Sequence, residues 1–222
     1  MHARGDFRDL EILSAEERLR HARFVFDRDA RDYAAAHGLL RRALSACGAV
    51  APADWQLHAL PNHKPRIVPE QAGEPPLLFS LSHTQGFVAC AAARGMEVGI
   101  DVESIERSRE AHDVARRFFA PKEIAMLDRC TNDREHAVRF LELWTLKEAY
   151  VKAIGQGLSV PLDRFSIAFN DAGAPVFEAE DGLPAGPFLF QLLTPRPDVR
   201  IGLAVRCEDP AAVRVTSGPL TS

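Results

Sequence analysis

The stretch from Leu141 to Leu158, LELWTLKEAYVKAIGQGL, constrains the fold more than any other part of this chain. Glu148 and Lys152 stand four residues apart in it, and Gly155 and Gly157 follow as helix-ending residues. Apolar residues recur through the stretch at spacings of three and four, the period of a helix with one buried face. They are Phe140, Leu143, Trp144, Val151 and Ile154. The pattern predicts a long packed helix with a carboxylate and an ammonium group along one edge.

A second stretch, MEVGIDVE from Met96 to Glu103, alternates with the period of a β-strand. Asp101 and Glu103 therefore point to the same side of the predicted strand. A Glu–Lys pair on a helix is usually a solvated ion pair, but two carboxylates on one strand face repel each other unless a cation or protons intervene. With Glu148 as a third oxygen ligand, the set suits Mg²⁺, which often binds substrate phosphates as well. We therefore expect a magnesium site and a phosphate-containing substrate.

Composition limits the class of protein. The chain has 222 residues, of which 46% are hydrophobic and 26% charged, as in an ordinary folded domain. A net charge of −4 disfavours a nucleic-acid binder that works through overall charge. The longest apolar run, Phe87 to Ala93, is too short to span a membrane, and the first residues do not resemble a signal peptide, so we expect a cytoplasmic protein. Four scattered cysteines indicate reduced thiols.

Charge is distributed unevenly near the start of the chain. Between Arg18 and Arg42 there are seven arginines against three aspartates. This segment is either a solvated arginine face or an anion site, since guanidinium groups bind phosphate oxygens bidentately. The sequence leaves both interpretations open.

Runs of helix and runs of strand alternate, which predicts an α+β fold with antiparallel strands. Ser14 and Glu17 form a capping-box pattern that starts an early helix. The residues from His83 to Gly86 are expected as a turn, and the Gly- and Pro-rich stretch from Asp171 to Pro187 as a connection. The expected strands include Leu77–Ser82, Phe87–Ala93, Phe165–Phe169, Phe188–Leu193 and Arg200–Val205.

The two principal motifs, GIDVE and WTLKEAYVKAIGQGL, resemble in order and separation the paired signature of the 4'-phosphopantetheinyl transferase superfamily. Three further stretches match the family: FSLSHT, RRFFAPKE and PLDRF. Together the matches span most of the chain. Its length is similar to the single-chain, surfactin-synthetase-activating type of the family.

The resemblance implies an architecture and a catalytic centre. The fold would be a pseudo-dimer of two similar α+β halves, residues 1–103 and 104–222, each an antiparallel sheet packed on helices, with the active site in the cleft between them. Asp101, Glu103 and Glu148 would hold Mg²⁺. Glu148, directly or through a metal-bound water, would be the general base, and Lys152 would stabilise the leaving phosphate or the attacking oxygen.

The resemblance also implies substrates. The enzyme would move the 4'-phosphopantetheine group from coenzyme A to a serine of an apo acyl, polyketide or peptidyl carrier protein, and would act as a monomer without nucleic acid or membrane. Coenzyme A would be bound by a set of polar residues drawn from several motifs. That set is Arg31, Arg41, Lys64, Ser82, His83 and Lys147.

Two other functions remain open at this point. One is a non-catalytic module that binds coenzyme A or the carrier protein, and the other is a Mg²⁺-dependent phosphohydrolase that uses the same carboxylates. The intact set Asp101, Glu103, Glu148 and Lys152 favours a catalyst over a binder.

Overall fold

The computed structural model describes residues 7–58, 64–106, 111–157, 160–180, 182–184 and 186–219. The helices are α1 (Phe7–Ile12), α2 (Ala15–His21), α3 (Asp27–Cys47), α4 (Pro69–Ala72), α5 (Ala111–Phe118), α6 (Pro121–Leu127) and α7 (Asp133–Ile154). The strands are β1 (Leu57–His58), β2 (Arg66–Ile67), β3 (Leu77–Thr84), β4 (Phe87–Arg94), β5 (Val98–Ser104), β6 (Phe165–Phe169), β7 (Pro175–Ala179), β8 (Phe188–Arg196) and β9 (Val199–Arg206). Short 3₁₀ turns are η1 (Pro52–Asp54), η4 (Leu162–Arg164) and η5 (Pro210–Ala212).

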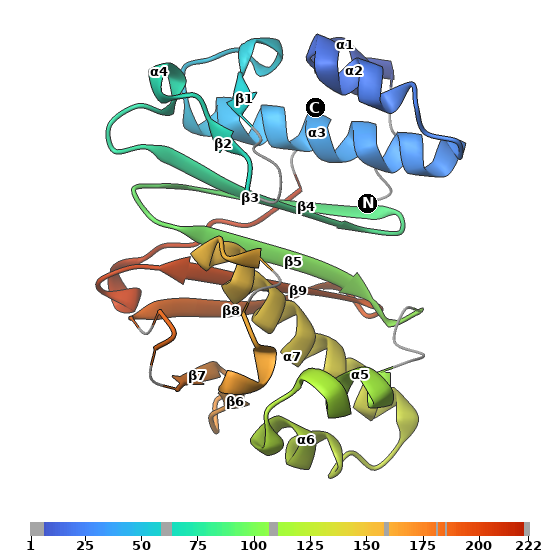
Figure 1. Ribbon diagram of the computed structural model, residues 1–222, viewed down its shortest axis with the longest axis vertical. Coiled ribbons are helices and arrows are strands. Elements are labelled where there is room, and N and C mark those ends of the chain that lie inside the picture. Colours follow the sequence, from blue (N-terminus) through green and yellow to red (C-terminus); the bar gives the residue numbers. More distant parts are fainter. Residues whose placement is uncertain are drawn as a thin grey trace.

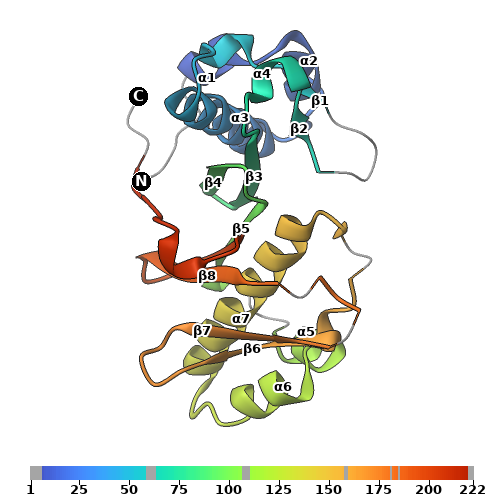
Figure 2. The same cartoon turned by 90° about the vertical axis from the view of Figure 1, so that its left-hand side faces the viewer.

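All strand pairs are antiparallel, in the sheets β1-β2, β3-β4, β6-β7 and β5-β9-β8. Helix α3 lies along the β3-β4 hairpin, and α7 lies against the β5-β9-β8 sheet (Figures 1 and 2). The α+β class with antiparallel sheets on helices is therefore confirmed. Strand β5, at the end of the predicted N-terminal half, pairs with β9 of the other half, and the boundary at residue 103 stays a prediction.

Helix α7 is the predicted long helix. The Asn132 side chain accepts from the Glu135 N–H at its start, and Gly155, with φ of 71°, closes its end. Its buried face forms the centre of the largest apolar cluster. Side chains with no exposed surface there are Leu143, Leu146, Ala149, Tyr150 and Ala153. Of the predicted stripe, Phe140, Leu143 and Val151 are buried in this cluster, and Trp144 and Ile154 are half-buried against it, so the stripe is confirmed. Helix α7 carries both Glu148 and Lys152.

The two halves repeat one structural device, which the sequence alone did not reveal. Glu17 on α2 accepts the Ser14 N–H and binds Arg41 on α3 at 2.8 Å. Glu123 on α6 likewise accepts the Ala120 N–H and binds Lys147 on α7 at 2.7 and 2.8 Å. Each basic residue follows its glutamate by 24 residues and is at most 1% exposed.

In both halves the basic side chain also donates to backbone carbonyl groups. Arg41 donates to Pro52, Ala53 and Trp55, and Lys147 donates to Phe165. A short helix is thus fastened to a long one by a buried ion pair, once in each half. This repetition supports the pseudo-dimer architecture independently of motif resemblance.

Two glycines allow α7 to lie directly on the sheet. A Cβ atom at Gly99 of β5 would collide with the backbone oxygen of Ala149, and one at Gly202 of β9 would collide with that of Thr145. Gly202 stands opposite Asp101 in the β5-β9 register. The glycines therefore set the separation between α7 and the strand that carries Asp101.

We expect Gly202→Ala to lower the free energy of unfolding by about 1 to 3 kcal/mol, because the added methyl group overpacks the helix–sheet contact. Gly218→Ala is the matched control, since a Cβ there meets nothing within 4 Å. Chemical denaturation of the two variants measures the difference. Equal stabilities would show that α7 does not need the close approach.

The ion pair of Glu17 makes stability depend on pH. Burial raises the pKa of Glu17, but hydrogen bonds from His37, the Ser14 N–H and Arg41 lower it more, so the pKa falls from 4.5 to about 2. Because the folded pKa lies below the unfolded one, this stabilisation is complete above the unfolded value and is lost as the pH falls toward the folded one. We expect Glu17→Gln to lower the free energy of unfolding by about 3 kcal/mol near neutral pH. The loss of stability between neutral pH and pH about 2 should also be smaller in the variant, as measured by urea denaturation at a series of pH values. The same acid dependence in both proteins would contradict this.

Some expectations concern single elements. The short strands β1 and β2 pair with each other, with Leu57 opposite Ile67. Strand β7 lies inside the stretch that was predicted as a connection, so that prediction was wrong there.

All four cysteines are free thiols, as expected. Among the described residues, no helix combines the length and apolar character needed to cross a bilayer.

Candidate active site

Three side chains from three elements meet where the halves join. The Lys152 Nζ atom of α7 lies 2.6 Å from Oδ1 of Asp101 on β5 and 3.0 Å from Oγ of Ser82 on β3. The Ser82 hydroxyl donates to the same Asp101 oxygen at 2.8 Å. Asp101 is 5% exposed and the Lys152 side chain 30%, so the cluster is buried on one side and open to solvent through the lysine.

Local structure explains why these groups converge. Alternation along β5 turns Asp101 toward α7, and the Gly99 and Gly202 contacts bring the helix within reach of it. Lys152 is in the last turn of α7, where the helix dipole favours a cation. Asp101 and Lys152, which the family resemblance assigned to one catalytic centre, are therefore in direct contact in the structure.

The predicted carboxylates share one electrostatic environment. Burial raises the pKa of Glu148, the negative charges of Asp101 and Glu103 raise it further, and Lys152 opposes them. The Oδ2 atom of Asp101 is buried and has no hydrogen-bond partner among the described residues. Glu103 accepts a hydrogen bond from Thr84 at 3.2 Å. The charges of Asp101 and Glu103 therefore raise the proton affinity of Glu148, and Lys152 is the cation that binds Asp101.

The carboxylates are not arranged as a closed metal site. In the described part of the chain, no group of three or more His, Cys, Asp or Glu side chains is placed to hold a metal ion. Lys152 instead occupies one oxygen of Asp101. The expected assignment of Mg²⁺ to Asp101, Glu103 and Glu148 thus rests on their shared charge, and it stays a prediction.

Ser82 and His83, expected together on coenzyme A, point in different directions. Strand β3 continues to Thr84, so the turn is shorter than predicted and His83 belongs to the strand. Alternation buries Ser82, which is 7% exposed, and exposes His83. Only Ser82 joins the Asp101 cluster.

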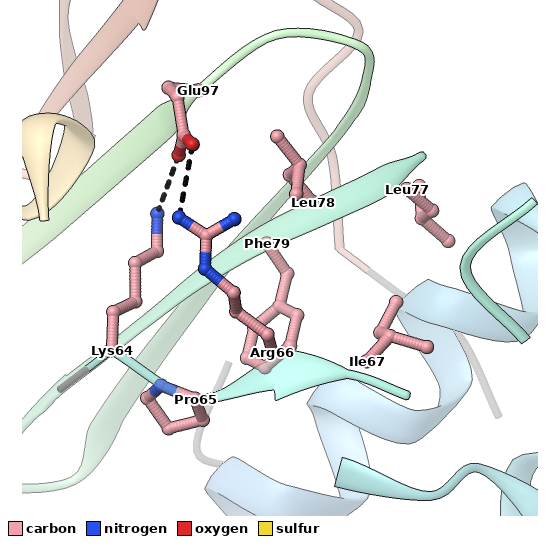
Figure 3. A pocket seen from close by; sticks show the side chains of 8 residues that line it. All are labelled: Lys64, Pro65, Arg66, Ile67, Leu77, Leu78, Phe79 and Glu97. Atoms are coloured by element: carbon pink, nitrogen blue, oxygen red, sulfur yellow. Dashed lines mark hydrogen bonds and ion pairs between the residues drawn. The ribbon is translucent and has the colours of Figure 1, made fainter. Parts of the chain in front are cut away.

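Lys64 lies in a small pocket beside the start of β5. Its ammonium group donates to the Val98 carbonyl at 2.6 Å and lies 3.9 Å from Glu97, which also binds Arg66 (Figure 3). Burial lowers the pKa of Lys64 to about 8, against the opposing effect of Glu97. The lining residues are Lys64, Pro65, Arg66, Ile67, Leu77, Leu78, Phe79 and Glu97. Lys64 is thus near the strand of Asp101 but outside the Asp101 cluster.

The remaining expected coenzyme contacts divide into two kinds. Arg31 on α3 is exposed and accessible to an anion. Arg41 and Lys147 are the buried members of the two repeated ion pairs, with 1% and 0% exposure. The structure therefore differs from the expectation for Arg41 and Lys147, because their donors bind glutamate and backbone carbonyls inside the protein, and we do not retain them as coenzyme ligands.

Comparison with known proteins gives matches over both halves. Residues 97–204 match the family described as the 4'-phosphopantetheinyl transferase superfamily, and residues 5–95 match the family described as 4'-phosphopantetheinyl transferase, N-terminal. A 4'-phosphopantetheinyl transferase of Bacillus subtilis is 32% identical over 175 residues, which cover 79% of this chain and 75% of the relative.

Two further relatives carry the same activity in their names. The 4'-phosphopantetheinyl transferase Sfp of Bacillus subtilis strain 168 is 30% identical over 174 residues, covering 78% of this chain and 74% of Sfp. The 4'-phosphopantetheinyl transferase HetI of Nostoc sp. is 34% identical over 158 residues. That match covers 71% of this chain and 65% of HetI, slightly less than two thirds of the relative.

Proposed function

The chain belongs to the 4'-phosphopantetheinyl transferase superfamily of enzymes, and from that membership we propose that it transfers 4'-phosphopantetheine from coenzyme A to a serine of an apo carrier protein. The second product would be adenosine 3',5'-bisphosphate. The observation that carries the proposal is the cluster of Ser82, Asp101 and Lys152 at the junction of the halves, with Glu148 in the same electrostatic environment.

Lys152 supplies positive charge where the pyrophosphate of coenzyme A would react. Its ammonium group is fixed by Asp101 and Ser82 yet remains partly exposed, so it can also bind an oxygen of the substrate. Charge that builds up on phosphoryl oxygens and on the leaving group is stabilised by such a fixed cation. Lys152 therefore has the chemistry and the access for this role.

Glu148 is the proposed general base. Its pKa is raised by burial and by Asp101 and Glu103, so its carboxylate accepts a proton more readily than an ordinary glutamate. The proton would come from the attacking serine hydroxyl of the carrier protein. Lys152, one helical turn away, favours the ionised form that this step requires.

Asp101, Glu103 and Glu148 are the residues that would hold Mg²⁺. The unpartnered, buried Oδ2 atom of Asp101 and the raised pKa of Glu148 both fit a cation in this place. When bound, Mg²⁺ would neutralise the negative charge of the pyrophosphate oxygens.

Coenzyme A would be bound by Arg31, Lys64, Ser82 and His83, the members of the predicted set that are not part of the two repeated ion pairs. Arg31 and His83 are exposed, while Lys64 lines the pocket next to Glu97 and Ser82 lies beside Lys152. Acyl, polyketide and peptidyl carrier proteins are the candidate acceptors. We further propose that the enzyme works in the cytoplasm as a monomer, without nucleic acid or membrane.

Mass spectrometry of an apo carrier protein tests the proposed function. The protein is incubated with coenzyme A, Mg²⁺ and a small panel of apo acyl, polyketide and peptidyl carriers, and the mass of each carrier is measured. A transferase adds one phosphopantetheine group, whereas a binding module adds nothing and a phosphohydrolase releases free phosphopantetheine. The variant Asp101→Asn, which keeps the shape of the side chain but removes its charge, should give no transfer. No gain in mass with any carrier would refute the proposal.

A further inference from the structure

Strands β3 and β5 lie side by side but belong to different sheets (Figures 1 and 2). Strand β3 pairs with β4, and β5 is an edge strand that pairs with β9. An edge strand presents backbone N–H groups that need acceptors. The junction between the halves of the protein thus contains donors that strand pairing within β5-β9-β8 does not use.

Hydroxyl side chains at alternate positions of β3 fill this junction. The Ser80 hydroxyl accepts from the Ile100 N–H at 3.1 Å, and the Ser82 hydroxyl accepts from the Val102 N–H at 3.4 Å. Ser80, Ser82 and Thr84 are 4%, 7% and 2% exposed. We call these three residues the hydroxyl seam.

The seam contacts the carboxylate-bearing part of β5 at each step. The Ser80 hydroxyl accepts from the backbone N–H of Ile100, the residue immediately before Asp101. The Ser82 hydroxyl donates to the Asp101 carboxylate at 2.8 Å. Thr84 donates to Oε2 of Glu103 at 3.2 Å. The Asp101 and Glu103 carboxylates, two of the proposed cation ligands, therefore each accept a hydrogen bond from a buried hydroxyl group of β3.

We propose that Ser80 and Thr84 are positioning residues that fix the Asp101 and Glu103 carboxylates for Mg²⁺, an inference that rests on the proposed function. Thr84 orients Glu103 through a direct hydrogen bond, and Ser80 holds the β5 backbone beside Asp101. Groups that hold a metal-binding carboxylate in place are commonly worth 10- to 100-fold in metal affinity. Ser80, Ser82 and Thr84 are at alternate positions of β3, so all three side chains lie on the same face of the strand.

Calorimetric titration with Mg²⁺, in the presence of coenzyme A and without carrier protein, tests the inference. Thr84→Val keeps the shape of the side chain but removes the donor, and we expect it to weaken Mg²⁺ binding by about 10- to 100-fold. Thr84→Ser restores the hydroxyl and should bind Mg²⁺ like the unmodified protein. Thr131→Val is the matched control, since the Thr131 hydroxyl donates to Glu135 at 2.7 Å on the exposed surface.

Ser80→Ala provides a second variant should Thr84→Val fold poorly. It removes the acceptor of the Ile100 N–H and should also weaken Mg²⁺ binding, while thermal melting without Mg²⁺ shows whether each variant remains folded. Unchanged Mg²⁺ affinity in folded Thr84→Val and Ser80→Ala would overturn the positioning role. Since the titration omits the carrier, that outcome is distinct from failure of transfer by the unmodified protein, which would instead refute the proposed function.

Discussion

Replacing Lys147 by methionine is expected to lower the free energy of unfolding by about 3 to 5 kcal/mol, because it leaves a buried carboxylate without its counter-charge. Glu123 and Lys147 are both fully buried, and the ammonium group binds both carboxylate oxygens. Burial lowers the pKa of Lys147 to about 8 despite Glu123, so the lysine is still mostly charged at neutral pH. Methionine retains much of the apolar stem but none of the three donated hydrogen bonds.

The variant Lys122→Met is the matched control for this loss. Lys122 also pairs with a glutamate, Glu178, but the two side chains are 75% and 58% exposed. Exposed pairs contribute about 0 to 1 kcal/mol, so urea denaturation should separate the two variants clearly. Equal losses would contradict the structural role of Lys147. The Lys147→Met protein that remains folded should keep the KM of the unmodified protein for coenzyme A. The Lys147 ammonium group donates to Glu123 and to the Phe165 carbonyl, not to the Asp101 cluster.

Arg41 and Lys147 show what sequence patterns could not predict. Both stand in motifs that suggest a phosphate ligand, and spacing gives no sign of a glutamate 24 residues earlier on another helix. The only available signal was that both glutamates occupy capping positions at the start of short helices. An arginine and a lysine in these equivalent places resemble ligands by residue type, but burial decides their role.

The parts that were predicted depend on strong local periodicity. Helix α7 and strand β5 follow from patterns of period 3.6 and 2, whereas Asp101 and Lys152 were assigned to one catalytic centre only through the family resemblance. Strand β7 was missed because its sequence, PVFEA, lies within a stretch rich in Gly and Pro, and the hairpin that it forms with the preceding strand β6 is visible only in the structure. The hydroxyl seam was missed for a similar reason. Alternating hydroxyls in β3 are visible in the sequence, but the neighbouring strand they bind is not.

Glu148→Gln is expected to reduce kcat by about 10²- to 10⁴-fold, the usual contribution of general base catalysis. Glutamine keeps one oxygen ligand and the shape of the side chain but cannot accept the proton of the carrier serine. Raising Mg²⁺ to saturation should therefore leave kcat depressed, while the KM for coenzyme A remains close to that of the unmodified protein. The exposed Glu16→Gln variant, on α2, controls for the loss of one negative charge.

The dependence of the rate on pH separates a base from a metal ligand. Without a bound cation, burial and the charges of Asp101 and Glu103 raise the pKa of Glu148 above 4.5. Its carboxylate is then protonated at a higher pH than that of an ordinary glutamate. For the unmodified protein, kcat at saturating Mg²⁺ should fall at acidic pH as Glu148 becomes protonated, and a cation bound beside the carboxylate moves this loss to lower pH. The residual rate of Glu148→Gln should lack that acidic limb. If saturating Mg²⁺ instead restores the full rate, Glu148 serves only in coordination, and the candidate base is then a metal-bound water or Glu103, whose carboxylate accepts a hydrogen bond from Thr84.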